Sequence, residues 1–294
     1  MTTNFVQVGV DLGGTKVHSV VLGDEMNVLA QDTRLSGFGP TEVFRNLRDS
    51  IQEALSGISA ASVSSIGIGT PGTVDSGAGV VRHSLNLGIE SMDLRSLISD
   101  QFHCAVQVEN DVNATAFGLA KIFPQYDSLC YLNFGTGLAA GFVINGKVWS
   151  GASGLAGEIG HIPVGGKSDP CSCGQVGCLE IYSSWSGMRR NLSHYETAGD
   201  AWEKTASDPR SQKTWDEFVE SAVFSIQTIF LTLDPEVIFI GGGVVSSGPQ
   251  ALPRIVEALQ GLEAKAPLFA EKRVSERIRA MPKDVPVAAI GALG

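Results

Sequence analysis

The fold of this chain is decided by the stretch VQVGVDLGGTKVHSVVL, residues 6–22. Apolar residues alternate from Val6 to Leu12, small residues follow, and the strand pattern resumes from Val17 to Leu22. Because two alternating segments joined by a glycine turn are typical of a β-hairpin, the stretch predicts a pair of antiparallel strands. The turn itself differs from a P-loop and from a dinucleotide fingerprint, since its glycine spacing is different and no helix follows it.

The turn residues Asp11-Leu12-Gly13-Gly14-Thr15-Lys16 can serve phosphate binding. Small residues let backbone N–H groups approach phosphate oxygens closely. Asp11 can hold Mg²⁺ through water, because magnesium bound by one or two carboxylates keeps several waters. An ordinary tight hairpin is the alternative, and this motif by itself favours neither interpretation.

A second copy of this arrangement lies near residue 135. A strand pattern at 129–134 ends in Gly135-Thr136-Gly137, and a further strand pattern covers 138–144. Two such hairpins can clamp one polyphosphate, which favours phosphate binding at both turns. Further along, Gly241-Gly242-Gly243 follow a buried strand pattern and would suit a flat adenosine.

Apolar spacing predicts the remaining framework. Helices are expected over 40–56, 94–102, 112–121 and 214–233, and strands over 28–35, 65–69, 105–108 and 237–240. The alternation predicts an α/β protein whose ligands bind beyond the carboxyl ends of strands. The segment 191–213 is polar and weakly periodic, and the apolar tail 287–294 is expected to pack against another element.

Four soft or borderline metal ligands lie close together in the sequence: His161, Cys171, Cys173 and Cys178. Zinc binds Cys and His tetrahedrally, and four protein ligands leave no open position, so the pattern predicts a structural zinc site. The alternatives are buried apolar cysteines, or a disulfide with one cysteine left over. Both are disfavoured, because Pro170 before the first cysteine, and Ser and Gly between the cysteines, indicate a turn-rich loop. Cys104 and Cys130 are interpreted as core residues.

Two carboxylates flank the metal-ligand segment. Glu158 lies three residues before His161, and Glu180 lies two residues after Cys178. A metal that holds both ends of the loop would also fix these carboxylates in space. Carboxylates held in this way are suited to binding the hydroxyl groups of a polyol.

Asp111 lies at the junction of a predicted strand and a predicted helix. Because Asp is a favoured helix N-cap, capping is the better interpretation of this residue taken alone. In a chain with two phosphate turns, an acid at a strand end can instead accept a proton from a substrate hydroxyl, as an Asp does in phosphoryl transfer.

Composition sets limits on the class of protein. The 294 residues are many for one core and comfortable for two lobes, and 43% apolar with 18% charged residues is usual for a globular enzyme. A net charge of −10 disfavours nucleic acid as a partner, although glycine turns can still bind a nucleotide. Since no apolar run reaches the ~18 residues that a membrane span needs and no basic leader is present, a cytoplasmic protein without a membrane partner is expected.

Together the motifs resemble those of the ROK family of repressors, open reading frames and sugar kinases. The matching stretches are 11–16, Glu109-Asn110-Asp111-Val112-Asn113-Ala114, 135–137, Gly157-Glu158-Ile159-Gly160-His161 and Cys171–Glu180. The resemblance runs from about residue 6 to the C-terminus. It implies an α/β, two-lobed actin-like (RNase H-like) ATPase fold with an active-site cleft between the lobes. The smaller lobe would be 1–111 plus about 282–294, and the larger lobe, with the zinc loop, 112–281.

The resemblance also implies a function, namely phosphorylation of the 6-hydroxyl of glucose or a related hexose by ATP with Mg²⁺. Asp111 would be the general base. The sugar would be bound by Gly72, Asn110, Asp111, Glu158, His161 and Glu180. ATP would be bound by Asp11, Gly13, Gly14, Thr15, Lys16, Gly135, Thr136, Gly137, Gly242 and Gly243. A structural Zn²⁺ would be held by His161, Cys171, Cys173 and Cys178. Members of the family are often homodimers or homotetramers.

Two departures from the family pattern are present; the first is mild and no loss of activity is expected from it, and only the second bears on the substrate. Leu138-Ala139-Ala140 stands where the family often has further glycines, and Asn86-Leu87-Gly88 lacks the Pro-Asn-Leu wording common in glucokinase members. An N-acetylmannosamine or N-acetylglucosamine kinase is therefore the alternative. A sugar-responsive transcriptional regulator is less favoured, because the first strand is expected almost at Met1, where regulators carry a helix-turn-helix, and because the charge is acidic.

Overall fold

The computed structural model describes residues 5–58 and 62–294, so the first four residues of the predicted smaller lobe lie outside it. The chain forms two compact units. The first contains residues up to 125, 141–154 and 282–294, and the second contains 126–140 and 155–281. Helix α3 (Asp111–Ile122), expected at the start of the larger lobe, belongs to the first unit because it packs against α11 (Val287–Ala292).

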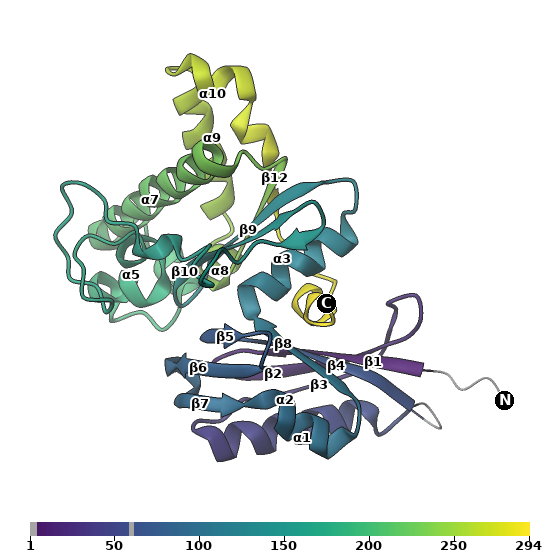
Figure 1. The fold of residues 1–294 in the computed structure, drawn as a ribbon. Coiled ribbons are helices and arrows are strands. Elements are labelled where there is room, and N and C mark those ends of the chain that lie inside the picture. The colour runs from purple at the N-terminus through teal and green to yellow at the C-terminus, as the bar shows by residue number, and fades with distance from the viewer. Residues whose placement is uncertain (1–4, 59–61) are drawn as a thin grey trace. The chain divides into compact units, whose positions relative to one another are not determined.

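The first unit is built on a sheet in the order β3-β2-β1-β4-β8 (Figure 1). The predicted hairpin is confirmed, since β1 (Phe5–Leu12) pairs antiparallel with β2 (Lys16–Leu22). The third strand, β3 (Val28–Leu35), pairs antiparallel with β2. Both β4 (Ser62–Thr70) and β8 (Ala105–Asn110) run parallel, and their carboxyl ends therefore meet the end of β1.

Helices cover the two faces of this sheet. Helix α1 (Pro40–Leu55) begins with Pro at its first turn and packs its apolar face on β2 and β3. Val17 of β2 shares one core with Leu47 and Ile51 of the helix. Helix α2 (Leu94–Phe102) is capped by Asp93, which accepts from Ser96 N. On the opposite face lies α11, so the expectation that the apolar tail packs against another element is confirmed.

Glycines allow α11 to approach the sheet closely. A Cβ on Gly67 would collide with the carbonyl oxygen of Ala292, and one on Gly9 would collide with that of Ala289. We therefore expect Gly67→Ala to destabilise the fold by about 1–3 kcal/mol, as overpacking does. Gly57→Ala is the control, because a Cβ on Gly57 would have no neighbour within 4 Å. Urea unfolding of both variants checks this, and equal midpoints would contradict it.

Three short strands pair as a small sheet in the order β5-β6-β7. They are β5 (Thr73–Asp75), β6 (Val80–Ser84) and β7 (Ile89–Asp93), with a 3₁₀ turn at Leu85–Leu87. No strand was expected here, because each segment is brief and mixes exposed polar with buried apolar positions.

The second unit contains the order β10-β9-β12-β13. Strand β9 (Ser128–Phe134) lies between β12 (Val237–Gly241), which is parallel to it, and β10 (Leu138–Ile144). On the far side of β12 lies β13 (Ile278–Ala280). The end of β10 belongs to the first unit, where it pairs with β11 (Lys147–Val148).

The second unit also contains helices. The longest is α7 (Pro209–Leu233), and its predicted start at 214 is wrong, because Asp208 caps it and Pro209 opens it. The weakly periodic segment also forms α6 (Ala198–Glu203), which has a capping box at Thr197. The other helices are α4 (Glu180–Ser183), α5 (Trp185–Leu192), α8 (Gly243–Ser247), α9 (Ala251–Glu263) and α10 (Pro267–Lys272), with 3₁₀ turns at Ile159–His161 and Val274–Arg277.

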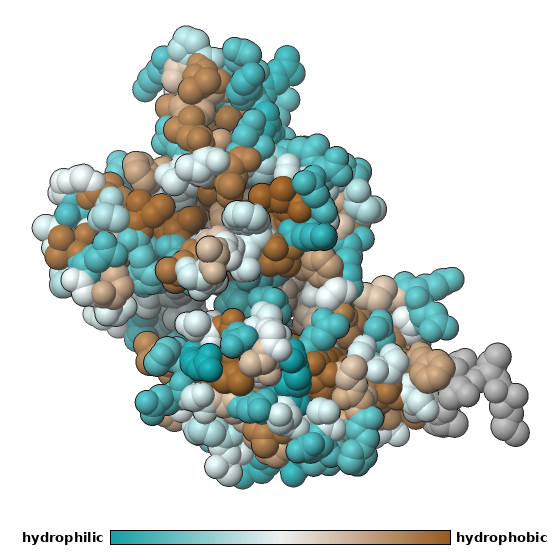
Figure 2. Space-filling model, viewed as in Figure 1, coloured by the Kyte–Doolittle hydropathy of each residue, from teal (hydrophilic) through white to brown (hydrophobic). Residues whose placement is uncertain are grey.

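Surface hydropathy is mixed. Figure 2 shows hydrophobic residues gathered over α10, where Leu268 is exposed, among hydrophilic ones. Within the part of the chain that the structure describes, no helix is both long and apolar enough to cross a membrane.

Candidate active site and metal centre

Two acids of the predicted site, Asp11 and Asp111, lie at the carboxyl edge of the first sheet. Asp11 on β1 pairs with Gly69 on β4, and Gly69 pairs with Glu109 on β8. A Cβ at residue 69 would lie 3.6 Å from Asp111 Cα and 3.1 Å from Ala114 Cβ, so glycine lets α3 start close to this edge. Burial raises the pKa of the Asp11 carboxyl, and His18 offsets part of this effect. A bound cation would favour the charged form.

Hydrogen bonds and a close side chain hold the first glycine turn in place. Gly13 N donates to Lys16 O at 2.9 Å, and Ser36 Oγ donates to Gly13 O at 2.6 Å. Asn86 covers the other side, since its Cβ would lie 2.8 Å from a Cβ on Gly14. Ser36 and Asn86 were not predicted as part of this site, because they reach the turn only through the fold.

Asn110 caps helix α3, although Asp111 was the predicted capping candidate. Asn110 Oδ1 accepts from the N–H groups of Val112 at 3.0 Å and Asn113 at 3.2 Å. Asn110 Nδ2 donates to Gly72 O at 3.4 Å, so the predicted residues Gly72, Asn110 and Asp111 lie together. Asp111 is the first helical residue, and its Oδ1 accepts from Val112 N at 3.0 Å. Asn110 therefore supplies the cap of α3, and Asp111 stands directly after it at the first helical position.

The second glycine turn lies beside Glu180. Leu138 N, the first N–H after Gly135-Thr136-Gly137, donates to Glu180 Oε2 at 3.3 Å. A Cβ on Gly137 would come within 2.7 Å of the same oxygen. The start of α5 holds the turn as well, because Ser186 Oγ donates to Thr136 O at 2.6 Å. A predicted sugar ligand and a predicted phosphate turn are therefore in contact.

The third segment predicted to bind the nucleotide, Gly241-Gly242-Gly243, passes close to the end of β9 at Gly242. Gly242 has φ +93°, and a Cβ there would lie 2.6 Å from Asn133 Oδ1. Gly243 begins α8, and a Cβ on it would have no neighbour within 4 Å. Glycine is therefore required at 242 by the close approach of β9, whereas at 243 it leaves open space.

The four predicted metal ligands converge. His161, Cys171, Cys173 and Cys178 place one ligand atom each within 4.8 Å of one another. The Sγ atoms of Cys173 and Cys178 are 3.7 Å apart, and Cys171 Sγ lies 3.7 Å from His161 Nδ1. Two thiolates on one tetrahedral zinc, each ~2.3 Å from the metal, are ~3.8 Å apart, whereas a disulfide measures ~2.0 Å. These residues therefore fit a four-ligand zinc site and not a disulfide.

The thiols of Cys173 and Cys178 have opposite pKa shifts. The pKa of Cys173 is lowered to about 6, chiefly by the hydrogen bond from Gln175 N–H, which favours the thiolate that binds metals. Burial raises the pKa of Cys178 to about 12. His161 Nδ1 faces Cys171, while its Nε2 lies 4.0 Å from Glu158 Oε2. One ring thus connects the metal cluster to a predicted sugar carboxylate.

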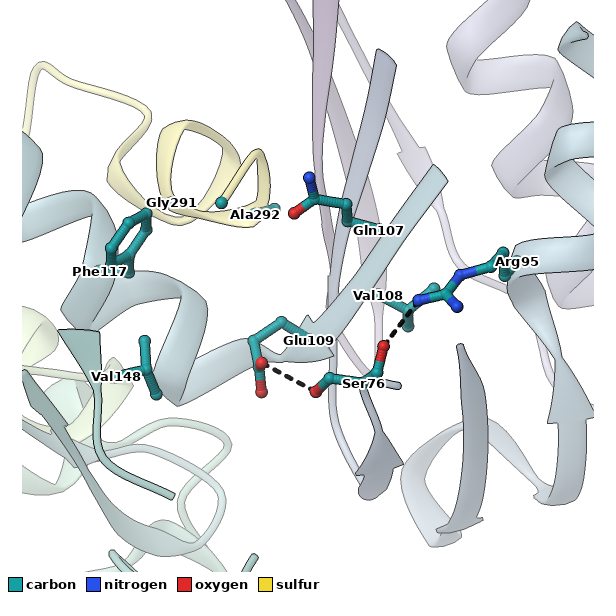
Figure 3. A pocket seen from close by; sticks show the side chains of 10 residues that line it. Ser76, Arg95, Gln107, Val108, Glu109, Phe117, Val148, Gly291 and Ala292 are labelled. Atoms are coloured by element: carbon teal, nitrogen blue, oxygen red, sulfur yellow. Dashed lines mark hydrogen bonds between the residues drawn. The ribbon is translucent and has the colours of Figure 1, made fainter. Parts of the chain in front are cut away.

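A cavity of about 270 Å³ lies in the first unit, behind the strand end that carries Asn110. Its lining includes Ser76, Arg95, Gln107, Glu109 and Phe117 (Figure 3). Asp111 is not among the described residues that line it. We therefore do not assign it to the sugar.

Comparison with known proteins identifies the family. The model of the ROK family matches residues 7–277. The chain belongs to the ROK family. A ROK hexokinase from Thermus thermophilus has the same fold, with a TM-score of 0.80 and 25% identity over 98% of this chain and 96% of that one. The fold is therefore the two-lobed, actin-like ATPase fold of the ROK sugar kinases.

Relatives within the family carry several names. A glucokinase of Halalkalibacterium halodurans is 31% identical over 84% of this chain and 83% of its own length. An N-acetyl-D-glucosamine kinase of Pasteurella multocida is 28% identical over 92% and 95%. A xylose repressor of Caldicellulosiruptor bescii is 33% identical over 60% of this chain, which covers 46% of that protein.

Proposed function

We propose that this ROK protein phosphorylates the 6-hydroxyl of a hexose, with glucose as the leading substrate. The general activity, without the choice of sugar, is that of an ATP:sugar phosphotransferase. The observation that carries the proposal is the position of Asp111. It is the first residue of α3, at the carboxyl end of β8, and the neighbouring Asn110 caps the helix. An Asp so placed can take the proton of an attacking hydroxyl, as in other phosphoryl-transfer enzymes.

The other site residues have roles in the same reaction. Asn110, Glu158, His161 and Glu180 would bind sugar hydroxyls, with Gly72 beside the sugar. The backbone N–H groups of the turns at 11–16 and 135–137 would hold phosphate oxygens, and Gly242 and Gly243 would leave room for adenosine. Mg²⁺, held by Asp11 through water, would neutralise phosphate charge. His161, Cys171, Cys173 and Cys178 would hold a structural Zn²⁺.

The second candidate substrate is an N-acylhexosamine. The similarity to an N-acetyl-D-glucosamine kinase over 92% of the chain favours it, and N-acetylmannosamine belongs to the same class. A regulatory role is the third candidate, because a xylose repressor is among the relatives. A cytoplasmic homodimer or homotetramer, implied by the family resemblance, stays a prediction.

A coupled ATPase assay with a panel of sugars tests the proposal. We expect sugar-dependent ATP consumption with glucose, mannose, fructose or one of the two N-acylhexosamines, matched by formation of the sugar phosphate. The control is 6-deoxyglucose, which lacks the accepting hydroxyl and should give no product. Absence of turnover with every sugar, together with sugar binding by calorimetry, would favour the regulator instead.

A further inference from the structure

Glu109, which has no assigned role, accepts three hydrogen bonds. It is the second-last residue of β8, directly before Asn110 and Asp111. Its Oε1 accepts from Asn110 N–H at 2.8 Å and from Asn113 Nδ2 at 3.3 Å. Its Oε2 accepts from Ser76 Oγ at 2.8 Å. One carboxylate therefore joins the capping residue, the first turn of α3 and a separate hairpin.

The hairpin that carries Ser76 is itself fixed. Arg95 on α2 donates to the carbonyl oxygen of Ser76 at 2.6 Å (Figure 3). It also donates to Gly77 O at 2.6 Å and to Val106 O at 3.1 Å. The guanidinium thus ties the turn between β5 and β6 to β8. Glu109 links the same turn to the strand end beside Asp111. We call this set of hydrogen bonds, made by Arg95, Ser76 and Glu109, the frame.

Hydrogen bonds, and not packing, hold the Glu109 carboxylate. The cavity of about 270 Å³ adjoins it, so one side of the residue lacks close neighbours. Losing the carboxylate would leave Asn110 N–H and Asn113 Nδ2 without this acceptor. The strand end could then shift by a fraction of an ångström, and Asp111 would shift with it. Misplacement by ~1 Å can cost ~10²-fold in rate.

We propose that Glu109 is a positioning residue, which sets the place of Asp111 for phosphoryl transfer through Asn110 N–H, Asn113 and the Ser76 hairpin. The inference rests on the proposed kinase function. It assigns Glu109 no proton transfer and no contact with the sugar. The family resemblance did not single out this role, since only the fold brings Ser76 and Arg95 to Glu109.

Four variants test the inference in steady-state kinetics with ATP and the accepted sugar. Glu109→Ala should lower kcat about 10–100-fold while KM for ATP stays within about twofold. Glu109→Gln should recover most of kcat, because its amide can accept from Asn110 N–H and donate to Ser76 Oγ. Ser76→Ala should lower kcat a few-fold, about the cost of one hydrogen bond.

Asp93→Ala is the matched control. The Asp93 carboxylate accepts from a backbone N–H and a serine hydroxyl, both of Ser96, in the same unit. It should lower the melting temperature and leave kcat unchanged. A kcat of Glu109→Ala within twofold of wild type, or a kcat loss equalled in Asp93→Ala, would overturn the inference.

Two further outcomes also decide the question. A Glu109→Gln loss as large as that of Asp111→Asn would make Glu109 a proton acceptor and overturn the positioning role. If Glu109→Ala does not fold, Ser76→Ala carries the test, because Ser76 is exposed and unchanged kcat in that variant would contradict the frame. Failure of the proposed function is distinct, since the wild-type protein would then phosphorylate no sugar.

Discussion

Asp111→Asn is expected to lower turnover by about 10²–10⁴-fold, the usual cost of losing a general base, while the protein stays folded. The substitution removes the proton acceptor and keeps the size of the side chain. The cap of α3 is unaffected, because Asn110 Oδ1 supplies it. Sugar binding should persist in part, since Asn110, Glu158 and Glu180 remain. Turnover, sugar affinity by calorimetry and melting temperature, measured together, check this.

A second Asp at a helix start provides the control for this variant. Asp93 caps α2, and Asn caps as well as Asp does, so Asp93→Asn should keep both turnover and stability. If Asp111 only supported the helix, Asp111→Asn would turn over at nearly the wild-type rate. That result would remove Asp111 from the mechanism and would leave the sugar-binding assignments untouched.

Local patterns in the sequence were sufficient for the hairpins and the metal cluster. The alternation on both sides of Gly13-Gly14 fixes the β1–β2 pair, because period-two burial and a glycine turn act over a few residues. The convergence of His161 and the three cysteines follows from ligand chemistry and turn residues in one short loop. These features need no information from distant parts of the chain.

Contacts between distant segments account for what the sequence did not predict. Helix α3 belongs to the first unit because it packs closely on α11. Two glycines allow this approach, since a Cβ on Gly118 would collide with Val287 O and one on Gly291 with Ala114 O. Neither glycine lies in a turn motif, so nothing in the local pattern marks this close packing. The same reason applies to Glu109, whose partner Ser76 lies on a hairpin of strands too short to show a period.

Cys173→Ser, or treatment with a chelator, is expected to unfold the predicted zinc loop locally and to lower the melting temperature. Binding energy at such a site is coupled to folding of its ligands, so the segment 161–178 should lose protection from hydrogen exchange. Each kcal/mol lost lowers the melting temperature by roughly 2–4 °C in a protein of this size class. Cys173 is exposed, so the loss would not come from core packing. Cys104→Ser, at a half-buried cysteine outside the cluster, is the control.

The damage should stay local, because a second set of contacts holds the base of the loop without metal. Tyr182 Oη donates to Asp169 at 2.5 Å, and Arg190 pairs with the same carboxylate at 2.6 Å. Glu180, beside Tyr182 on α4, should therefore keep its contact with Leu138 N. Glu158 and His161 would lose their placement, and activity should fall about 10–100-fold, as it does when the surroundings of a metal site are altered. Elemental analysis should find about one zinc per wild-type chain, and zinc-free protein with full activity and unchanged exchange would contradict a structural metal at this site.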